Sequence, residues 1–149
     1  PSRRPPGRMR GMNAAPRLLH SMRLPVRWGD MDALGHVNNA EYLRYFEQAR
    51  IQWLEAIGIR VDGRGEGPIL LKASVTWVKP VVYPCEIEVR QFAGRIGNTS
   101  FTVMAEIVNG RDAAERFTEG EFVIVWVDYA TGRPVPVPDF VRQKLGTTA

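Results

Sequence analysis

The sequence contains one cysteine, Cys85, and only two histidines, His20 and His36. A single cysteine cannot close a disulfide within the chain, which suits a reducing compartment, so we expect a cytoplasmic protein. The same scarcity excludes a metal site built from several cysteines or from a cluster of histidines. No apolar run approaches the ~18 residues of a membrane-spanning helix, so we expect no membrane as a partner.

Acidic residues are absent from residues 1–27, which hold seven arginines. Subtracting these seven charges from the formal net charge of +4 leaves the rest of the chain at −3. The Pro-, Gly- and Arg-rich composition predicts a disordered basic extension over residues 1–22 and one domain over residues 23–149. An organelle transit peptide and a nucleic-acid-binding arm are open interpretations of the extension. We favour a dispensable extension and do not expect nucleic acid as a partner.

Several common catalytic signatures are also missing, namely the GxSxG nucleophile elbow, the P-loop, GxGxxG and HExxH. Cys85 lies between a turn and a strand pattern, with no neighbouring feature that lowers the pKa of a thiol. An enzyme with this sequence must therefore use a carboxylate, and we expect neither a metal nor a redox cofactor.

Residues 40–57 have the apolar spacing of a helix. The repeating positions are Tyr42, Phe46, Ala49, Trp53 and Ile57. Leu43, Tyr45 and Leu54 broaden this stripe, which predicts a helix buried over much of its circumference.

The rest of the chain favours strands. Residues 24–28 predict one short strand before the helix, and a Gly-rich loop over 62–68 follows the helix. The apolar period then changes to two, with strands predicted near 69–79, 85–95, 99–108 and 114–128. Short turns between them, including a hairpin at Asn109-Gly110, require antiparallel pairing. One long apolar helix needs cover on several sides, which predicts an α+β fold with a curved sheet around it.

Polar residues gather where the first strand meets the helix, in WGDMDALGHVNN at positions 28–39. Unpaired N–H groups and the dipole at a helix N-terminus bind anions or stabilise a developing oxyanion. A carboxylate beside such a site, Asp30 or Asp32, can act as nucleophile or as general base. Each residue also has a purely structural interpretation, because Asp and Asn are common turn residues and Asn38 or Asn39 can cap the helix.

The run GDMDALGHVNNAEYLRYFEQAR (29–50) resembles the hotdog-fold acyl-CoA thioesterases of the 4-hydroxybenzoyl-CoA thioesterase family. The match extends through SVTWVKPVVYP, RIGNTSF and FVIVWVDYATGRPVPVP, and covers roughly residues 24–140. The resemblance implies a hotdog fold, in which a curved antiparallel sheet of about five strands surrounds one long central helix. It also implies hydrolysis of an acyl-CoA thioester by a homodimer or a homotetramer, in which two sheets join edge to edge.

The resemblance also implies roles for individual residues of the junction. Asp32 takes the place of the catalytic carboxylate, as nucleophile or general base, and the backbone N–H of Asn39 helps to polarise the thioester carbonyl. His36 and Asn38 are expected to hold the loop of the substrate site, and Tyr42 to line the acyl or thioester pocket.

Three further residues match a region that approaches the pantetheine arm and phosphates of CoA in this family. They are Arg95, Thr99 and Ser100. A polar hairpin connection is an equally good interpretation of the same three residues.

Two other functions stay open. A hotdog enoyl thioester hydratase or dehydratase would use an acid together with His36. A non-catalytic acyl-CoA-binding module would use the Arg-rich arm to hold an acidic partner or nucleic acid. Product analysis separates the enzymes, because hydrolysis releases a free thiol and hydration gives a hydroxyacyl-CoA.

Overall fold

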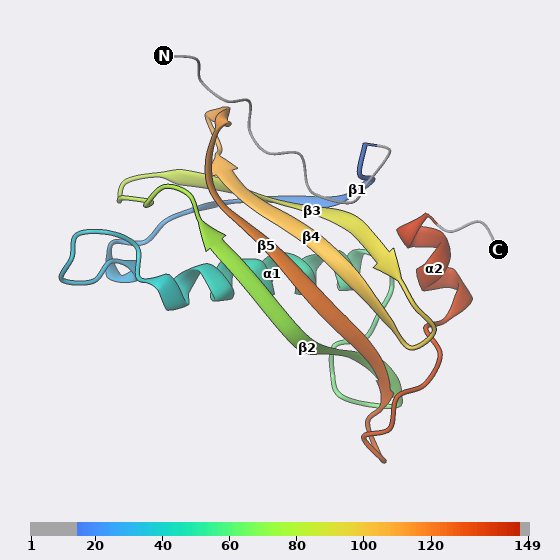
Figure 1. Ribbon diagram of the computed structural model, residues 1–149. Coiled ribbons are helices and arrows are strands. Elements are labelled where there is room, and N and C mark those ends of the chain that lie inside the picture. The colour runs from blue at the N-terminus through green and yellow to red at the C-terminus, as the bar shows by residue number, and fades with distance from the viewer. Residues whose placement is uncertain (1–14, 147–149) are drawn as a thin grey trace.

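A computed structural model describes residues 15–146, which form one antiparallel sheet with helices on one side (Figure 1). The strands are β1 (Leu18–Pro25), β2 (Glu66–Trp77), β3 (Glu86–Ile96), β4 (Ser100–Asn109) and β5 (Asp112–Asp128). The helices are the 3₁₀ turn η1 (Trp28–Asp30) and the α-helices α1 (Asn39–Ala56) and α2 (Asp139–Leu145). The strand order is β1-β3-β4-β5-β2, so β1 and β2 are the edges. The predicted order of one strand, one long helix and four strands is confirmed.

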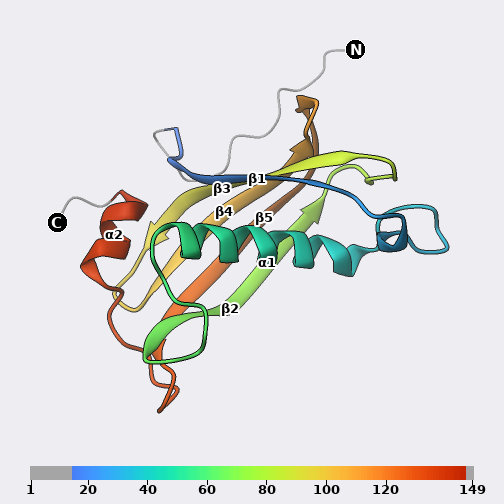
Figure 2. The same cartoon turned by 180° about the vertical axis from the view of Figure 1, so that it is seen from behind.

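Helix α1 crosses one face of the sheet (Figure 2). Its buried residues are Tyr42, Tyr45, Phe46, Ala49, Trp53 and Leu54. Phe46 lies against Phe122 of β5, with ring centroids 4.8 Å apart. The prediction that Leu43 widens the buried stripe was wrong, because its side chain is 45% exposed. Only one face of α1 is therefore covered in the single chain.

Two clusters of buried side chains fill the space between α1 and the sheet. The first surrounds the N-terminal half of the helix, and the second surrounds Trp53 and Leu54 at its other end. Helix α2, which the sequence analysis did not predict, adds Val141 and Leu145 to the second cluster. Neither α-helix described in residues 15–146 is long and apolar enough to cross a membrane.

The first strand lies earlier than the predicted range of 24–28. Strand β1 pairs with β3 from Leu18 onward, so the domain boundary expected after residue 22 falls within a strand of the sheet. At Trp28 the chain turns into η1. Residues 1–14 of the predicted disordered extension lie outside the described residues.

The hairpin predicted at Asn109-Gly110 joins β4 to β5. Asn109 pairs with Asp112, so Gly110 and Arg111 are the two connecting residues. The side-chain oxygen of Asn109 accepts a hydrogen bond from the N–H of Arg111 at 2.9 Å, a common way in which Asn stabilises a turn.

Candidate functional site

The loop between η1 and α1 is a tight turn with a well-defined backbone. Met31 and Val37 form an isolated antiparallel bridge across it. The N–H of Asp32 donates to the carbonyl of His36 at 3.1 Å, and the N–H of Gly35 donates to the carbonyl of Asp32 at 3.0 Å. Gly35 has a φ of 81°, a left-handed conformation that glycine adopts without a steric penalty. This loop brings the acidic residues next to the start of α1.

Asp30 is buried beneath the loop, with 4% of its surface exposed. Its carboxylate accepts hydrogen bonds from the Tyr45 hydroxyl at 2.7 Å and from the backbone N–H and Nε of Arg27 at 3.0 and 3.2 Å. Burial alone would raise the pKa of Asp30, but these hydrogen bonds and the Arg27 charge outweigh it and lower the pKa. Asp30 thus ties the loop to α1, and its oxygens are occupied by protein donors.

Asp32 is the more accessible of the two acids. Its Oδ1 accepts from the N–H of Leu34, and its Oδ2 accepts from the side-chain amide of Asn38, both at 2.9 Å. The Leu34 and Asn38 hydrogen bonds lower the pKa of Asp32. The carboxylate is therefore ionised at neutral pH and held in one orientation, while its side chain is only partly buried.

Helix α1 begins with a side-chain cap. The Oδ1 of Asn38 accepts from the N–H of Ala40 at 2.9 Å, which confirms Asn38 as the N-cap. The N–H of Glu41 donates to the carbonyl of Asn38. The N–H of Asn39 has no hydrogen-bond partner among residues 15–146. Because Asn38 also binds Asp32, one residue couples the carboxylate to the helix N-terminus.

A cavity of about 150 Å³ lies beside this N-terminus. His36, Asn39 and Tyr42 line one side of it. The Tyr42 hydroxyl accepts a hydrogen bond from the N–H of Val81 at 3.1 Å, and burial raises its pKa. The structure thus brings together five of the predicted site residues, with Asp32 and Asn38 adjacent to the cavity wall.

The other wall comes from the connection between β2 and β3, to which the sequence analysis gave no role at the site. Trp77, Lys79 and Pro80 line the cavity there, and Trp77 packs edge-on against Tyr42 with ring centroids 5.9 Å apart. These residues lie within the SVTWVKPVVYP stretch of the family resemblance, which was the available signal.

Arg95, Thr99 and Ser100 lie at the β3–β4 hairpin, apart from the other predicted site residues. The start of β3 at Glu86 pairs with Pro25, close to the η1 loop, whereas this hairpin follows the opposite end of β3. Helix α2 lies near it, and Arg142 donates to the carbonyls of Gly97 and Asn98. A single chain therefore does not bring these three residues to Asp32.

Within residues 15–146, no group of three or more His, Cys, Asp and Glu side chains is placed to hold a metal ion. The model of the thioesterase-like superfamily matches residues 26–145. The chain belongs to this superfamily. Its junction, with Asp32 beside a helix N-terminus, lies within the matched range.

Two solved structures and one curated relative are similar to this thioesterase-like chain. A structure described as a thioesterase candidate from Pseudomonas aeruginosa is 42% identical, covers 87% of this chain and 100% of its own, and has a TM-score of 0.84. A structure described as an acyl-CoA thioesterase candidate from Xanthomonas campestris is 36% identical, covers 75% and 95% of the two chains, and has a TM-score of 0.69. The chloroplastic acyl-acyl carrier protein thioesterase ATL3 of Arabidopsis thaliana is 29% identical over 131 residues, 85% of this chain and 67% of that protein.

These findings confirm the predicted α+β hotdog fold and the predicted thioesterase family. The class of enzyme, a thioester hydrolase, follows from the family.

Proposed function

We propose that the protein hydrolyses acyl-CoA thioesters to a free acid and CoA, with Asp32 as the catalytic carboxylate. The observation that carries this proposal is the arrangement around Asn38. Its amide holds the ionised Asp32 carboxylate, and its backbone leads into the unpaired N–H of Asn39 at the start of α1.

The thioester carbonyl lies at the start of α1, where the Asn39 N–H and the helix dipole stabilise the oxyanion. Asp32 either attacks the carbonyl carbon, forming a mixed anhydride that water then hydrolyses, or removes a proton from the attacking water. The lowered pKa of Asp32 keeps the carboxylate ionised at neutral pH, as both routes require. The part of the substrate next to the thioester lies in the cavity that His36 and Tyr42 line.

A homodimer is part of the proposal, since the single chain leaves a long apolar edge open. Strand β2 pairs only with β5, and its other edge has no partner strand among residues 15–146. Ile69, Leu70 and Leu71 are 44%, 40% and 67% exposed there. Pairing the β2 edges of two copies buries these side chains and satisfies the unpaired backbone groups. A role for the β3–β4 hairpin in binding CoA then depends on the second subunit.

The function is tested by thiol release from acyl-CoAs running from acetyl to palmitoyl, with benzoyl-CoA and phenylacetyl-CoA included. The matching acyl carrier protein thioesters are assayed in parallel. Release of CoA with the free acid supports the proposal. A hydroxyacyl-CoA product from an enoyl-CoA indicates a hydratase instead. If only the acyl carrier protein thioesters are hydrolysed, the substrate is an acyl carrier protein thioester and not an acyl-CoA.

A further inference from the structure

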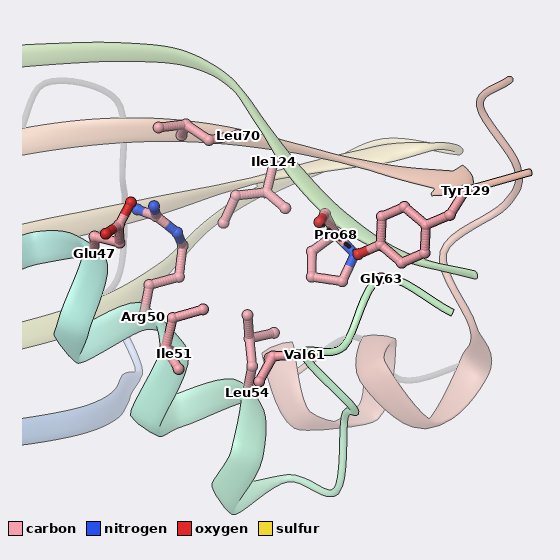
Figure 3. Close-up of a pocket in the computed structure, with 10 residues that line it drawn as sticks. All are labelled: Glu47, Arg50, Ile51, Leu54, Val61, Gly63, Pro68, Leu70, Ile124 and Tyr129. Carbon is pink, nitrogen blue, oxygen red and sulfur yellow. Dashed lines mark hydrogen bonds between the residues drawn. The ribbon is translucent and has the colours of Figure 1, made fainter. Parts of the chain in front are cut away.

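Helix α1 borders two cavities. The larger has a volume of about 400 Å³ and lies along the second half of the helix, where Leu70 of β2 forms part of its wall (Figure 3). The proposed homodimer buries this part of β2. The smaller, of about 150 Å³, lies at the N-terminus of the helix, with Asn39 and Tyr42 in its wall. The two cavities share no lining residue, and the smaller is the one that adjoins the loop of Asp32.

Tyr42 is held in one position in the wall of the smaller cavity. Its ring packs edge-on against the rings of Tyr45 and Trp77, with centroids 6.1 and 5.9 Å away. Its hydroxyl oxygen accepts a hydrogen bond from the N–H of Val81 at 3.1 Å. The carbonyl of Val81 accepts from the N–H of Val37 at 2.9 Å. One residue of the β2–β3 connection therefore fixes both the hydroxyl and the loop that carries the proposed catalytic carboxylate.

The proton of the Tyr42 hydroxyl has no acceptor among residues 15–146. A tyrosine hydroxyl can donate one hydrogen bond in addition to accepting, and a buried donor without an acceptor is unfavourable. Tyr42 is 1% exposed, and burial raises the pKa of its hydroxyl, which therefore stays protonated at neutral pH. The hydroxyl lies beside the peptide bond between Pro80 and Val81, and Pro80 lines the same cavity. A ligand in this cavity can supply the missing acceptor.

We propose that Tyr42 is a catalytic residue whose hydroxyl donates a hydrogen bond to the thioester carbonyl oxygen, together with the N–H of Asn39. The two residues are three positions apart and lie on the same face of α1. Helical side chains lean toward the N-terminus of their helix, which brings the Tyr42 ring toward the free N–H of Asn39. This inference rests on the proposed function and adds a second donor to its site.

The hydrogen bond from Tyr42 strengthens as the carbonyl oxygen gains negative charge, because hydrogen bonds to charged groups are stronger than those to neutral ones. The hydroxyl keeps its proton throughout the reaction. Its contribution is therefore stabilisation of the oxyanion, and the attack by Asp32 or by water is unchanged.

Binding of two analogues that cannot be hydrolysed tests the proposal. In the ketone analogue of butyryl-CoA, a methylene replaces the thioester sulfur and the carbonyl oxygen is kept. In S-butyl-CoA, a methylene replaces the carbonyl, so the acceptor is missing. By calorimetric titration at neutral pH, we expect the wild type to bind the ketone more tightly than S-butyl-CoA. We expect Tyr42→Phe to reduce this preference about 3- to 10-fold, the effect of one neutral hydrogen bond.

Tyr45→Phe is the matched control, because it removes a hydroxyl from the neighbouring ring whose proton goes to Asp30 at 2.7 Å. This control is expected to keep the wild-type preference for the ketone. In thiol release, Tyr42→Phe is expected to lower kcat/KM about 10- to 100-fold, since the oxygen is negatively charged in the transition state. Circular dichroism checks that both variants are folded.

Three results would overturn the proposal. The first is a wild type that binds neither analogue or does not prefer the ketone. The second is an unchanged preference in Tyr42→Phe, and the third is an equal loss of affinity for both analogues, which would make the role of Tyr42 structural. Because the analogues are bound and not hydrolysed, the test can be read even if the protein hydrolyses no acyl-CoA. Thiol release by the wild type with an unchanged preference in Tyr42→Phe would overturn the role of Tyr42 alone.

Discussion

Tyr45→Phe removes the hydroxyl that anchors Asp30, the buried acid of the junction. The variant keeps the ring, which is 3% exposed, and deletes only the 2.7 Å hydrogen bond to the Asp30 carboxylate. A hydrogen bond to a charged group is worth roughly 1.5–3 kcal/mol, and Asp30 keeps its donors from Arg27. We therefore expect the free energy of unfolding at pH 7 to fall by about 2 kcal/mol.

The loss depends on pH with a definite sign. The folded-state pKa of Asp30 is lowered below its ordinary value of 3.8, so its contribution to stability is complete above that pH. The contribution is lost as the pH falls through the folded-state pKa. The difference between wild type and Tyr45→Phe is therefore largest near neutral pH and shrinks below pH 3.8.

Urea unfolding followed by tryptophan fluorescence, at one protein concentration and several pH values, measures this difference. Tyr42→Phe is the matched control, because its hydroxyl accepts only a neutral backbone N–H. The control is expected to lose about 1 kcal/mol, with no added change below pH 3.8. A loss below about 0.5 kcal/mol in Tyr45→Phe, or a loss that does not change with pH, refutes the anchoring role of Asp30.

Three further predictions concern the junction, the β2 region and the subunit edge. Asn38→Asp keeps the cap on the Ala40 N–H but places a second carboxylate against Asp32, which raises the pKa of Asp32 and moves the acid limb of the kcat/KM profile to higher pH. Asn38→Ser caps the helix without adding a charge and leaves the acid limb unmoved. An unmoved limb in Asn38→Asp would contradict the contact between residue 38 and Asp32. Gly67→Ala puts a Cβ against the Tyr129 hydroxyl, closer than van der Waals contact allows, and lowers the free energy of unfolding in urea by about 1–3 kcal/mol. Gly29→Ala has open space and changes it by less than about 0.5 kcal/mol, so equal effects of the two variants would remove the steric argument. Leu71→Lys places a charge on the open β2 edge, so we expect the mass measured by light scattering to fall from that of a dimer to that of a monomer. Leu18→Lys, on the other edge strand β1, leaves the mass unchanged. An unchanged mass for Leu71→Lys would argue against pairing at β2.

The long elements were predictable because their periodicity is local. The apolar spacing of 40–57 predicted α1 to within one residue at each end, and alternation located the four later strands. Strand β1 was predicted too late, since its residues 18–22 follow an Arg-rich segment and pair with β3 only through tertiary contact. Helix α2 spans 7 residues, too few for a convincing period, and packing on the second cluster stabilises it.

The position of the site at the strand–helix junction was predictable from the sequence, but the different roles of Asp30 and Asp32 were not. Spacing could not decide between Asp30 and Asp32, because the difference arises from Tyr45, a residue fifteen positions along the chain. The wall at Trp77 and Lys79 comes from a distant connection between strands, which no local pattern locates at the start of α1. Contact between Arg95 and the junction is not possible within one chain, since β3 separates them.

The role of Asp32 is tested most directly by Asp32→Asn beside the wild type, with thiol release from the best acyl-CoA substrate and circular dichroism as the folding control. We expect a folded variant whose kcat/KM falls by ~10²–10⁴ or more, because Asn keeps the shape of the side chain but can neither attack nor accept the proton. Near-wild-type turnover in the folded Asp32→Asn variant would contradict a catalytic role of Asp32 and would make Asp30 the candidate for the catalytic carboxylate.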